Sequence, residues 1–92
     1  MVKTYAKGCR LENRARTMLE KQGYYVIRSA GSKGVIDLVA VSWRGIKLIQ
    51  VKSRGISKAE VDAIMDLRVP QNVHKEIWLW DVNTWSFQIQ VV

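Results

Sequence analysis

Residues 35–53, VIDLVAVSWRGIKLIQVKS, decide the fold of this 92-residue chain. They contain two runs rich in Val, Ile and Leu, residues 35–41 and residues 45–53, with turn-forming residues between and around them. Apolar runs of this length bounded by Gly and Ser are typical of buried strands, and the short connection between them predicts a hairpin. The stretch therefore predicts two adjacent strands at the centre of a sheet.

Three of the polar residues in these runs stand out: Asp37 in the first predicted strand, and Gln50 and Lys52 in the second. Gln50 and Lys52 are two residues apart, so they leave the same face of their strand, where Asp37 can meet them. A charge inside a protein is costly unless another group compensates it. The three residues indicate either a structural network, with Asp37 paired to Lys52, or a site for a divalent metal and a phosphodiester. Their shared face favours the second interpretation.

The composition is that of one globular domain, residues 1–92. Apolar residues make up 48% of the chain and charged residues 25%, which are ordinary values for a folded protein and argue against disorder. No apolar run reaches the roughly 18 residues that a membrane span needs, and no signal-peptide pattern opens the chain. The single cysteine, Cys9, fits a reducing compartment, so we expect a cytoplasmic protein without membrane contact. Its small size would suit a virus, a phage or a mobile element.

The positive charge is unevenly distributed. The net charge is +7, but residues 1–58 hold 13 Lys and Arg against 3 Asp and Glu, whereas residues 59–92 hold 2 against 5. Such asymmetry predicts one cationic face, and nucleic acid is the natural polyanion for it because phosphate contacts dominate nucleic-acid affinity. An anionic membrane surface is less favoured, because the basic residues do not line one face of an apolar helix.

A helix is predicted over residues 6–22, before the first strand. Its apolar side chains recur with helical spacing and form one stripe, and Gly23 supplies the stop; the stripe consists of Leu11, Ala15, Met18 and Leu19. Glu12 falls at the edge of this stripe, next to the face that packs on the sheet. Glu12 could instead form a surface ion pair with Arg16, one helical turn further on.

The other elements follow from turn and capping signals. A first strand is predicted over residues 24–28, and a second helix begins at Ser57, where Ser57 and Glu60 form a capping box, and ends before Pro70. Two final strands are predicted at residues 75–82 and 85–92. The expected fold is a small α/β domain in the order helix, three strands, helix, two strands, with a mixed, mainly antiparallel sheet flanked by helices.

Two further features have more than one interpretation. The final strands are rich in aromatic residues, which could stack on bases but are more often core or dimer contacts; they are Trp78, Trp80, Trp85 and Phe87. The loop at residues 29–34 contains two glycines and two serines and is flanked by Arg28 and Lys33, so it could hold a phosphate. Short loops of this kind usually hold nothing. His74, the single histidine, is expected at the surface.

The order of elements and a set of motifs resemble the archaeal and viral Holliday junction resolvases of the PD-(D/E)xK nuclease superfamily. The motifs that carry the resemblance are Gly8, Arg10, Glu12, the segment VIRSAGS at residues 26–32, Asp37, and Gln50-Val51-Lys52. The resemblance is best over residues 8–53 and implies a restriction-endonuclease-like fold.

This resemblance implies a site for Mg²⁺ or Mn²⁺. Asp37 would be the central metal ligand, Glu12 would reach the metal directly or through water, and the Val51 carbonyl would add a ligand. Resolvases of this kind usually have Glu where this chain has Gln50. An amide oxygen still coordinates a hard cation but brings no charge, so metal affinity would be lower. A Gln-x-Lys version also occurs in the related virus-type replication–repair nuclease domains.

The resemblance also implies roles in cleavage and DNA binding. Lys52 would orient or activate the attacking water and stabilise charge on the scissile phosphate, completing a catalytic set with Glu12, Asp37 and Gln50. Arg10 and Ser32 would hold the phosphate backbone, and their basic and polar neighbours would extend this contact. The expected DNA-binding residues are Arg10, Arg28, Ser29, Ser32, Lys33 and Arg54.

We therefore expect a metal-dependent endonuclease that cuts a four-way DNA junction and leaves 5′-phosphate and 3′-hydroxyl ends. Paired cuts require two active sites, so a homodimer is expected. Three alternatives remain open: a Gln-x-Lys nuclease acting on flaps, nicks or duplex DNA, a catalytically inactive DNA-binding module, and a basic accessory or protein-interaction domain.

Overall fold

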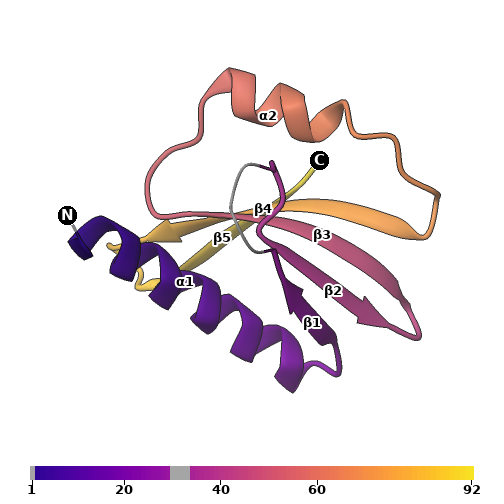
Figure 1. Ribbon diagram of the computed structural model, residues 1–92, viewed down its shortest axis with the longest axis horizontal. Coiled ribbons are helices and arrows are strands. Elements are labelled where there is room, and N and C mark those ends of the chain that lie inside the picture. The colour runs from indigo at the N-terminus through magenta and orange to yellow at the C-terminus, as the bar shows by residue number, and fades with distance from the viewer. Residues whose placement is uncertain (1, 30–33) are drawn as a thin grey trace.

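A computed structural model describes residues 2–29 and 34–92, with side chains from residue 10 onward (Figure 1). It confirms the expected order of helix, three strands, helix, two strands. The elements are α1 (Val2–Lys21), β1 (Tyr25–Arg28), β2 (Leu38–Ser42), β3 (Gly45–Lys52), α2 (Lys58–Met65), β4 (Val73–Asp81) and β5 (Ser86–Val91).

The five strands form one sheet in the order β1-β2-β3-β4-β5. Three neighbouring pairs are antiparallel, and β3 and β4 are parallel, so the expected mixed, mainly antiparallel sheet is confirmed. A parallel pair needs a crossover connection. Residues 53–72 provide it, and α2 lies within them.

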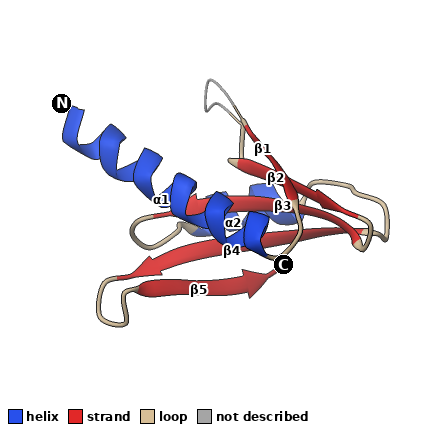
Figure 2. Ribbon diagram, turned by 90° about the horizontal axis from the view of Figure 1, so that it is seen from below, coloured by secondary structure: helices blue, strands red, loops and turns tan. Residues whose placement is uncertain are grey.

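The two helices cover opposite faces of the sheet (Figures 1 and 2). The stripe on α1 packs against β1, β2 and β3. Together with residues of β4 it forms the main core: Leu11, Ala15, Leu19, Leu38, Ala40, Ile49, Val51, Trp78 and Trp80. On the α2 side, Ile64 of the helix and Ile77 of β4 are fully buried. Strand residues alternate between the two faces, so Gln50 and Lys52 lie on the face opposite to Ile49 and Val51.

Helix α1 follows its predicted stripe closely and ends where Gly23 allows it. Ala15 and Leu19 are fully buried, whereas Met18, which we expected in the stripe, is 37% exposed at its margin. Gly23 adopts φ +96°, and the N–H of Tyr24 donates to the carbonyl of Leu19 at 3.1 Å, which closes the helix end. The helix begins at Val2 and is therefore longer than predicted.

Helix α2 begins at the predicted capping box. The N–H of Glu60 donates to Ser57 Oγ at 3.2 Å, and the N–H of Ser57 donates to Glu60 Oε1 at 3.0 Å. Two of the unpaired groups of the first turn are thereby satisfied. The helix ends at Met65, before Pro70, as expected.

Strand boundaries differ from the prediction by one to three residues, and two of the differences have a visible structural cause. The strand β2 begins at Leu38 and not at residue 35, because the backbone bends over the residues that precede it. Trp85, expected as the first residue of β5, belongs to the turn and has φ +56°. The Trp85 ring packs edge-on against Trp80, with ring centroids 5.3 Å apart, and this contact accompanies the unusual backbone conformation.

The aromatic residues of β4 and β5 mainly build the core. Trp78 is 1% exposed and Trp80 8% exposed, and Phe87 packs against both rings. This supports the interpretation of a core for these three residues, while Trp85 is 65% exposed. His74 is exposed, as expected. Neither helix of the described residues is long and apolar enough to cross a membrane.

Candidate active site

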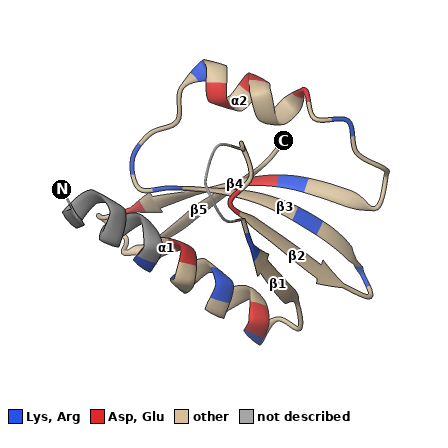
Figure 3. Cartoon of the chain, viewed as in Figure 1, with Lys and Arg blue, Asp and Glu red and all other residues tan. Residues whose placement is uncertain are grey.

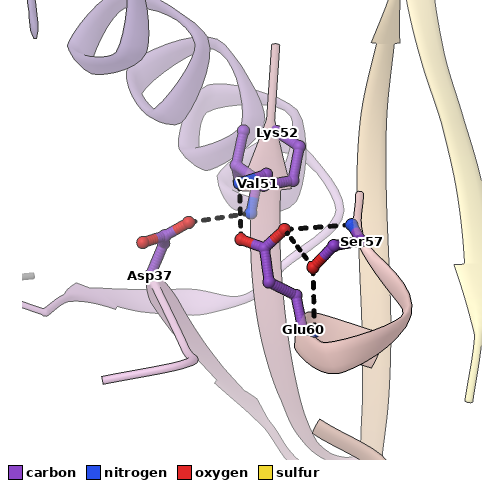
Figure 4. A network of polar contacts seen from close by, with 5 residues as sticks. All are labelled: Asp37, Val51, Lys52, Ser57 and Glu60. Carbon is purple, nitrogen blue, oxygen red and sulfur yellow. Dashed lines mark hydrogen bonds and ion pairs between the residues drawn. The ribbon is translucent and has the colours of Figure 1, made fainter. Parts of the chain in front are cut away.

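Asp37 lies immediately before β2 and is held on both sides by backbone hydrogen bonds. Its N–H donates to the carbonyl of Ile49 at 2.9 Å, and its carbonyl accepts from the N–H of Ser29 at 2.8 Å. Its side chain turns to β3, where Oδ2 accepts a hydrogen bond from the N–H of Val51 at 2.9 Å (Figure 4). Asp37 therefore meets β3 at the residue between Gln50 and Lys52.

The surroundings of Asp37 oppose its ionisation. Burial is the largest cause that raises the pKa of Asp37, and the negative charge of Glu12 raises it further. The hydrogen bond from Val51 and the positive charges of Lys52 and Arg28 act in the opposite direction. Glu12 and Lys52 thus lie within electrostatic reach of Asp37, and a raised carboxylate pKa is common at functional sites.

Glu12 faces the sheet and not its own helix. Its Oε1 accepts a hydrogen bond from Arg28 Nε at 2.9 Å, and its side chain is 20% exposed. Arg16 pairs with Glu20, at 3.8 Å, so the alternative of a surface pair between Glu12 and Arg16 is wrong. The helix therefore brings the Glu12 carboxylate to the end of β1, within electrostatic reach of Asp37.

Gln50 carries a buried polar atom without a hydrogen bond. Its Oε1 has no partner among the described residues. Leaving such a group unsatisfied costs about 1–3 kcal/mol, so an orphaned amide oxygen calls for an explanation. A bound group that this oxygen can coordinate is one such explanation.

Lys52 pairs with a residue that the sequence did not connect with it. Its Nζ donates to Glu60 Oε2 at 2.7 Å. The hydrogen bond from Lys52 is the main cause that lowers the pKa of Glu60 to about 2, and the N–H of Ser57 adds to this effect. The structural network that we considered, with Asp37 paired to Lys52 and Gln50 hydrogen-bonded, is thus not the arrangement observed.

Glu60 is the residue of this site that sequence analysis missed. The capping box explained Glu60 completely as a helix-start residue, and no strand pattern linked it to Lys52. The sequence contains only an indirect indication of this contact: Glu60 is a carboxylate at the start of the helix that follows a strand ending in Lys52.

The predicted DNA-binding residues surround this end of the sheet only in part. Arg10, Arg28, Ser29 and Arg54 are exposed. Arg28 is engaged with Glu12, whereas Ser32 and Lys33 lie outside the described residues. Basic residues lie on several elements, and α1 carries more of them than any other element (Figure 3).

The residues present fit a hard divalent cation. No three His, Cys, Asp or Glu side chains converge among the described residues. Two carboxylates, Glu12 and Asp37, and the orphaned Oε1 of Gln50 instead provide oxygen donors, which Mg²⁺ and Mn²⁺ prefer. The amide takes the place of a third carboxylate in this set.

Comparisons with known proteins identify the family and the fold. The family described as archaeal Holliday junction resolvase (Hjc) matches residues 3–66. The crossover junction endodeoxyribonuclease Hjc of Methanocaldococcus jannaschii is 43% identical over 54 residues, which cover 59% of this chain and 40% of that protein. The structure of Archaeoglobus fulgidus Hjc, a Holliday junction resolvase, superposes with a TM-score of 0.74 and 26% identity, covering 92% of this chain and 72% of that one. The chain therefore belongs to the archaeal Holliday junction resolvase family.

Proposed function

We propose that this protein is a metal-dependent endodeoxyribonuclease that hydrolyses phosphodiester bonds in Holliday junctions. The observation that carries the proposal is the meeting of Asp37 with β3 at Val51, which sets the carboxylate beside Gln50 and Lys52. Family membership and the names of the relatives support the same activity.

Four residues would hold Mg²⁺ or Mn²⁺. Asp37 would be the central ligand. Glu12 would contribute directly or through water, Gln50 would contribute its orphaned Oε1, and the Val51 carbonyl would add a further oxygen. When bound, the cation neutralises charge at the scissile phosphate and lowers the pKa of a nearby water.

Side chains of the protein provide the remaining functions, which are stabilisation of charge at the phosphate and binding of the DNA backbone. Lys52 places its ammonium at the scissile phosphate, where it stabilises the charge that develops during cleavage and orients the attacking water. Arg10, Arg28, Ser29 and Arg54 hold the phosphate backbone on either side, together with Ser32 and Lys33. We propose that the products carry 5′-phosphate and 3′-hydroxyl ends.

We also propose that the active form is a homodimer with two-fold symmetry. One chain contains one such site, and symmetrical cutting of a four-way junction requires two sites. Light scattering after size-exclusion chromatography, with and without junction DNA, tests this assembly. A mass of one chain in both conditions contradicts it.

Cleavage of labelled DNA tests the activity. Purified protein with Mg²⁺ or Mn²⁺ is offered a four-way junction, a flap, a nicked duplex and a linear duplex. Asp37→Asn and Lys52→Ala are expected to abolish cutting, while Asp66→Asn, at the exposed C-cap of α2, serves as the control.

The substrate profile separates the proposed function from its alternatives. Paired symmetrical cuts in the junction, lost in both site variants, support a resolvase. Equal cutting of every substrate keeps the nuclease but contradicts junction specificity. Binding without cutting under either metal contradicts the enzyme and favours a DNA-binding module in which Gln50 marks a lost site.

A further inference from the structure

Glu60 connects helix α2 to the lysine of the proposed active site. One oxygen of its carboxylate, Oε2, accepts from Lys52 Nζ at 2.7 Å. The other, Oε1, accepts from the N–H of Ser57 at 3.0 Å and from Ser57 Oγ at 3.1 Å. Figure 4 shows Asp37 and Glu60 directed at neighbouring residues of β3 from two different elements.

This contact differs from an ordinary surface ion pair. On the same helix, Lys58 and Asp62 pair at 3.0 Å with side chains 89% and 50% exposed, one helical turn apart. Lys52 is 26% exposed and Glu60 42%, so the difference lies mainly in the lysine, and the partner comes from another element. The Glu60 carboxylate is also held by the helix start, so its position is set independently of the lysine. Because the Glu60 carboxylate is already held in place, it can restrict the Lys52 ammonium to one position, and no second mobile side chain has to be ordered.

The charges of the site give this contact a function. Glu12 and Asp37 supply two negative charges, Lys52 and Arg28 supply two positive charges, and Gln50 is neutral. Glutamate at position 50, as in the resolvases that the sequence resembles, would add a third negative charge beside the lysine. Glu60 is a third carboxylate at Lys52, and it reaches the lysine from the helix instead of the strand.

We propose that Glu60 is a positioning residue that supplies the negative charge missing at Gln50 and holds the Lys52 ammonium in place for cleavage. This inference rests on the proposed nuclease function. One Glu60 oxygen accepts from Lys52 and the other from Ser57, so we assign the residue a role that it exerts through Lys52.

Four chains test the inference: the wild type, Glu60→Gln, Gln50→Glu with Glu60→Gln, and Asp62→Asn as a control from the same helix. Glutamine keeps the capping box, so Glu60→Gln retains the start of α2. We expect Glu60→Gln to lower the single-turnover cleavage rate about tenfold or more, the scale of a lost hydrogen bond to a charged group, while junction Kd measured in EDTA stays unchanged. Gln50→Glu in the same chain restores most of the rate, and Asp62→Asn leaves it unaltered.

A second readout does not depend on activity. Reductive methylation followed by mass spectrometry measures the accessibility of the Lys52 amine, with exposed Lys58 as the internal reference. We expect the Lys52 to Lys58 ratio to rise about threefold in Glu60→Gln, since a hydrogen bond to a charged acceptor is weakened, and to stay constant in Asp62→Asn.

The outcomes separate this inference from the proposed function. Unchanged cleavage and unchanged Lys52 reactivity in Glu60→Gln overturn it. If Glu60→Gln slows cleavage and Gln50→Glu in the same chain does not restore the rate, Glu60 does not supply the charge missing at position 50. If the wild type cuts nothing, the proposed function fails, while a rise in Lys52 reactivity still supports the anchoring contact.

Discussion

At the scale of single residues, Asp37 is an acid held where its charge is disfavoured. Burial raises the pKa of Asp37, so folding favours the protonated form and the ionised carboxylate destabilises the free protein at neutral pH. Asparagine removes this charge and can still accept from the N–H of Val51. We expect Asp37→Asn to abolish cleavage and to keep or raise the thermal midpoint, measured at pH 7 in EDTA. A clear fall in the midpoint would instead indicate that the carboxylate stabilises the fold.

Glu60 should show the opposite dependence on pH. The folded-state pKa of about 2 lies below the ordinary value of 4.5, so its contribution to stability is complete above about pH 4.5 and is lost as pH falls toward 2. The thermal midpoint of Glu60→Gln should therefore lie below that of the wild type at pH 7 and approach it between pH 4.5 and 2. Because this pair is partly exposed, 1 M NaCl should reduce the difference at pH 7. If the difference in thermal midpoint between the wild type and Glu60→Gln did not change with pH, the stabilising role assigned to the Glu60 charge would be contradicted.

At the scale of elements, the hairpin between β2 and β3 depends on a glycine. Gly45 has φ +134°, and a Cβ built there would lie 2.7 Å from the carbonyl oxygen of Asn72. Both the backbone strain and the contact oppose any side chain, so Gly45→Ala should lower the free energy of unfolding by about 1–3 kcal/mol. Urea unfolding measures the loss. Gly55→Ala is the matched control, because its Cβ would meet nothing within 4 Å.

Elements were predictable from sequence, whereas contacts between them were not. The stripe through Leu11 and Leu19 and the capping box at Ser57 are local patterns, and local patterns specify local structure. The pairing of Lys52 with Glu60 depends on how α2 docks on the sheet, which no periodicity encodes. The same holds for Gln50, whose orphaned oxygen results from the packing around it. Sequence patterns therefore predict the elements and single out Asp37, Gln50 and Lys52 as unusual, but they do not predict the contact of Lys52 with Glu60.

At the scale of the whole molecule, the excess of positive charge should govern DNA affinity. With a net charge of +7, log Kd for junction DNA should rise linearly with log salt concentration as counterions are released. Arg54→Ala should reduce the slope by about 1 if this exposed side chain contacts a phosphate. Arg68→Ala, in the segment between α2 and β4, is the control, and equal slopes for both variants would remove Arg54 from the DNA contact.

The parallel pairing of β3 with β4 also determines the order in which the site can assemble. Strands β1, β2 and β3 are consecutive antiparallel neighbours and require little loop closure, whereas β4 joins only after residues 53–72 close the crossover. Lys52 belongs to the first group and Glu60 to the crossover, so their contact depends on this late closure. We expect the contact between Lys52 and Glu60 to slow unfolding and to change the rate of folding little. We therefore expect one contact, between Lys52 and Glu60, to affect both the lifetime of the folded state and the position of the proposed catalytic lysine.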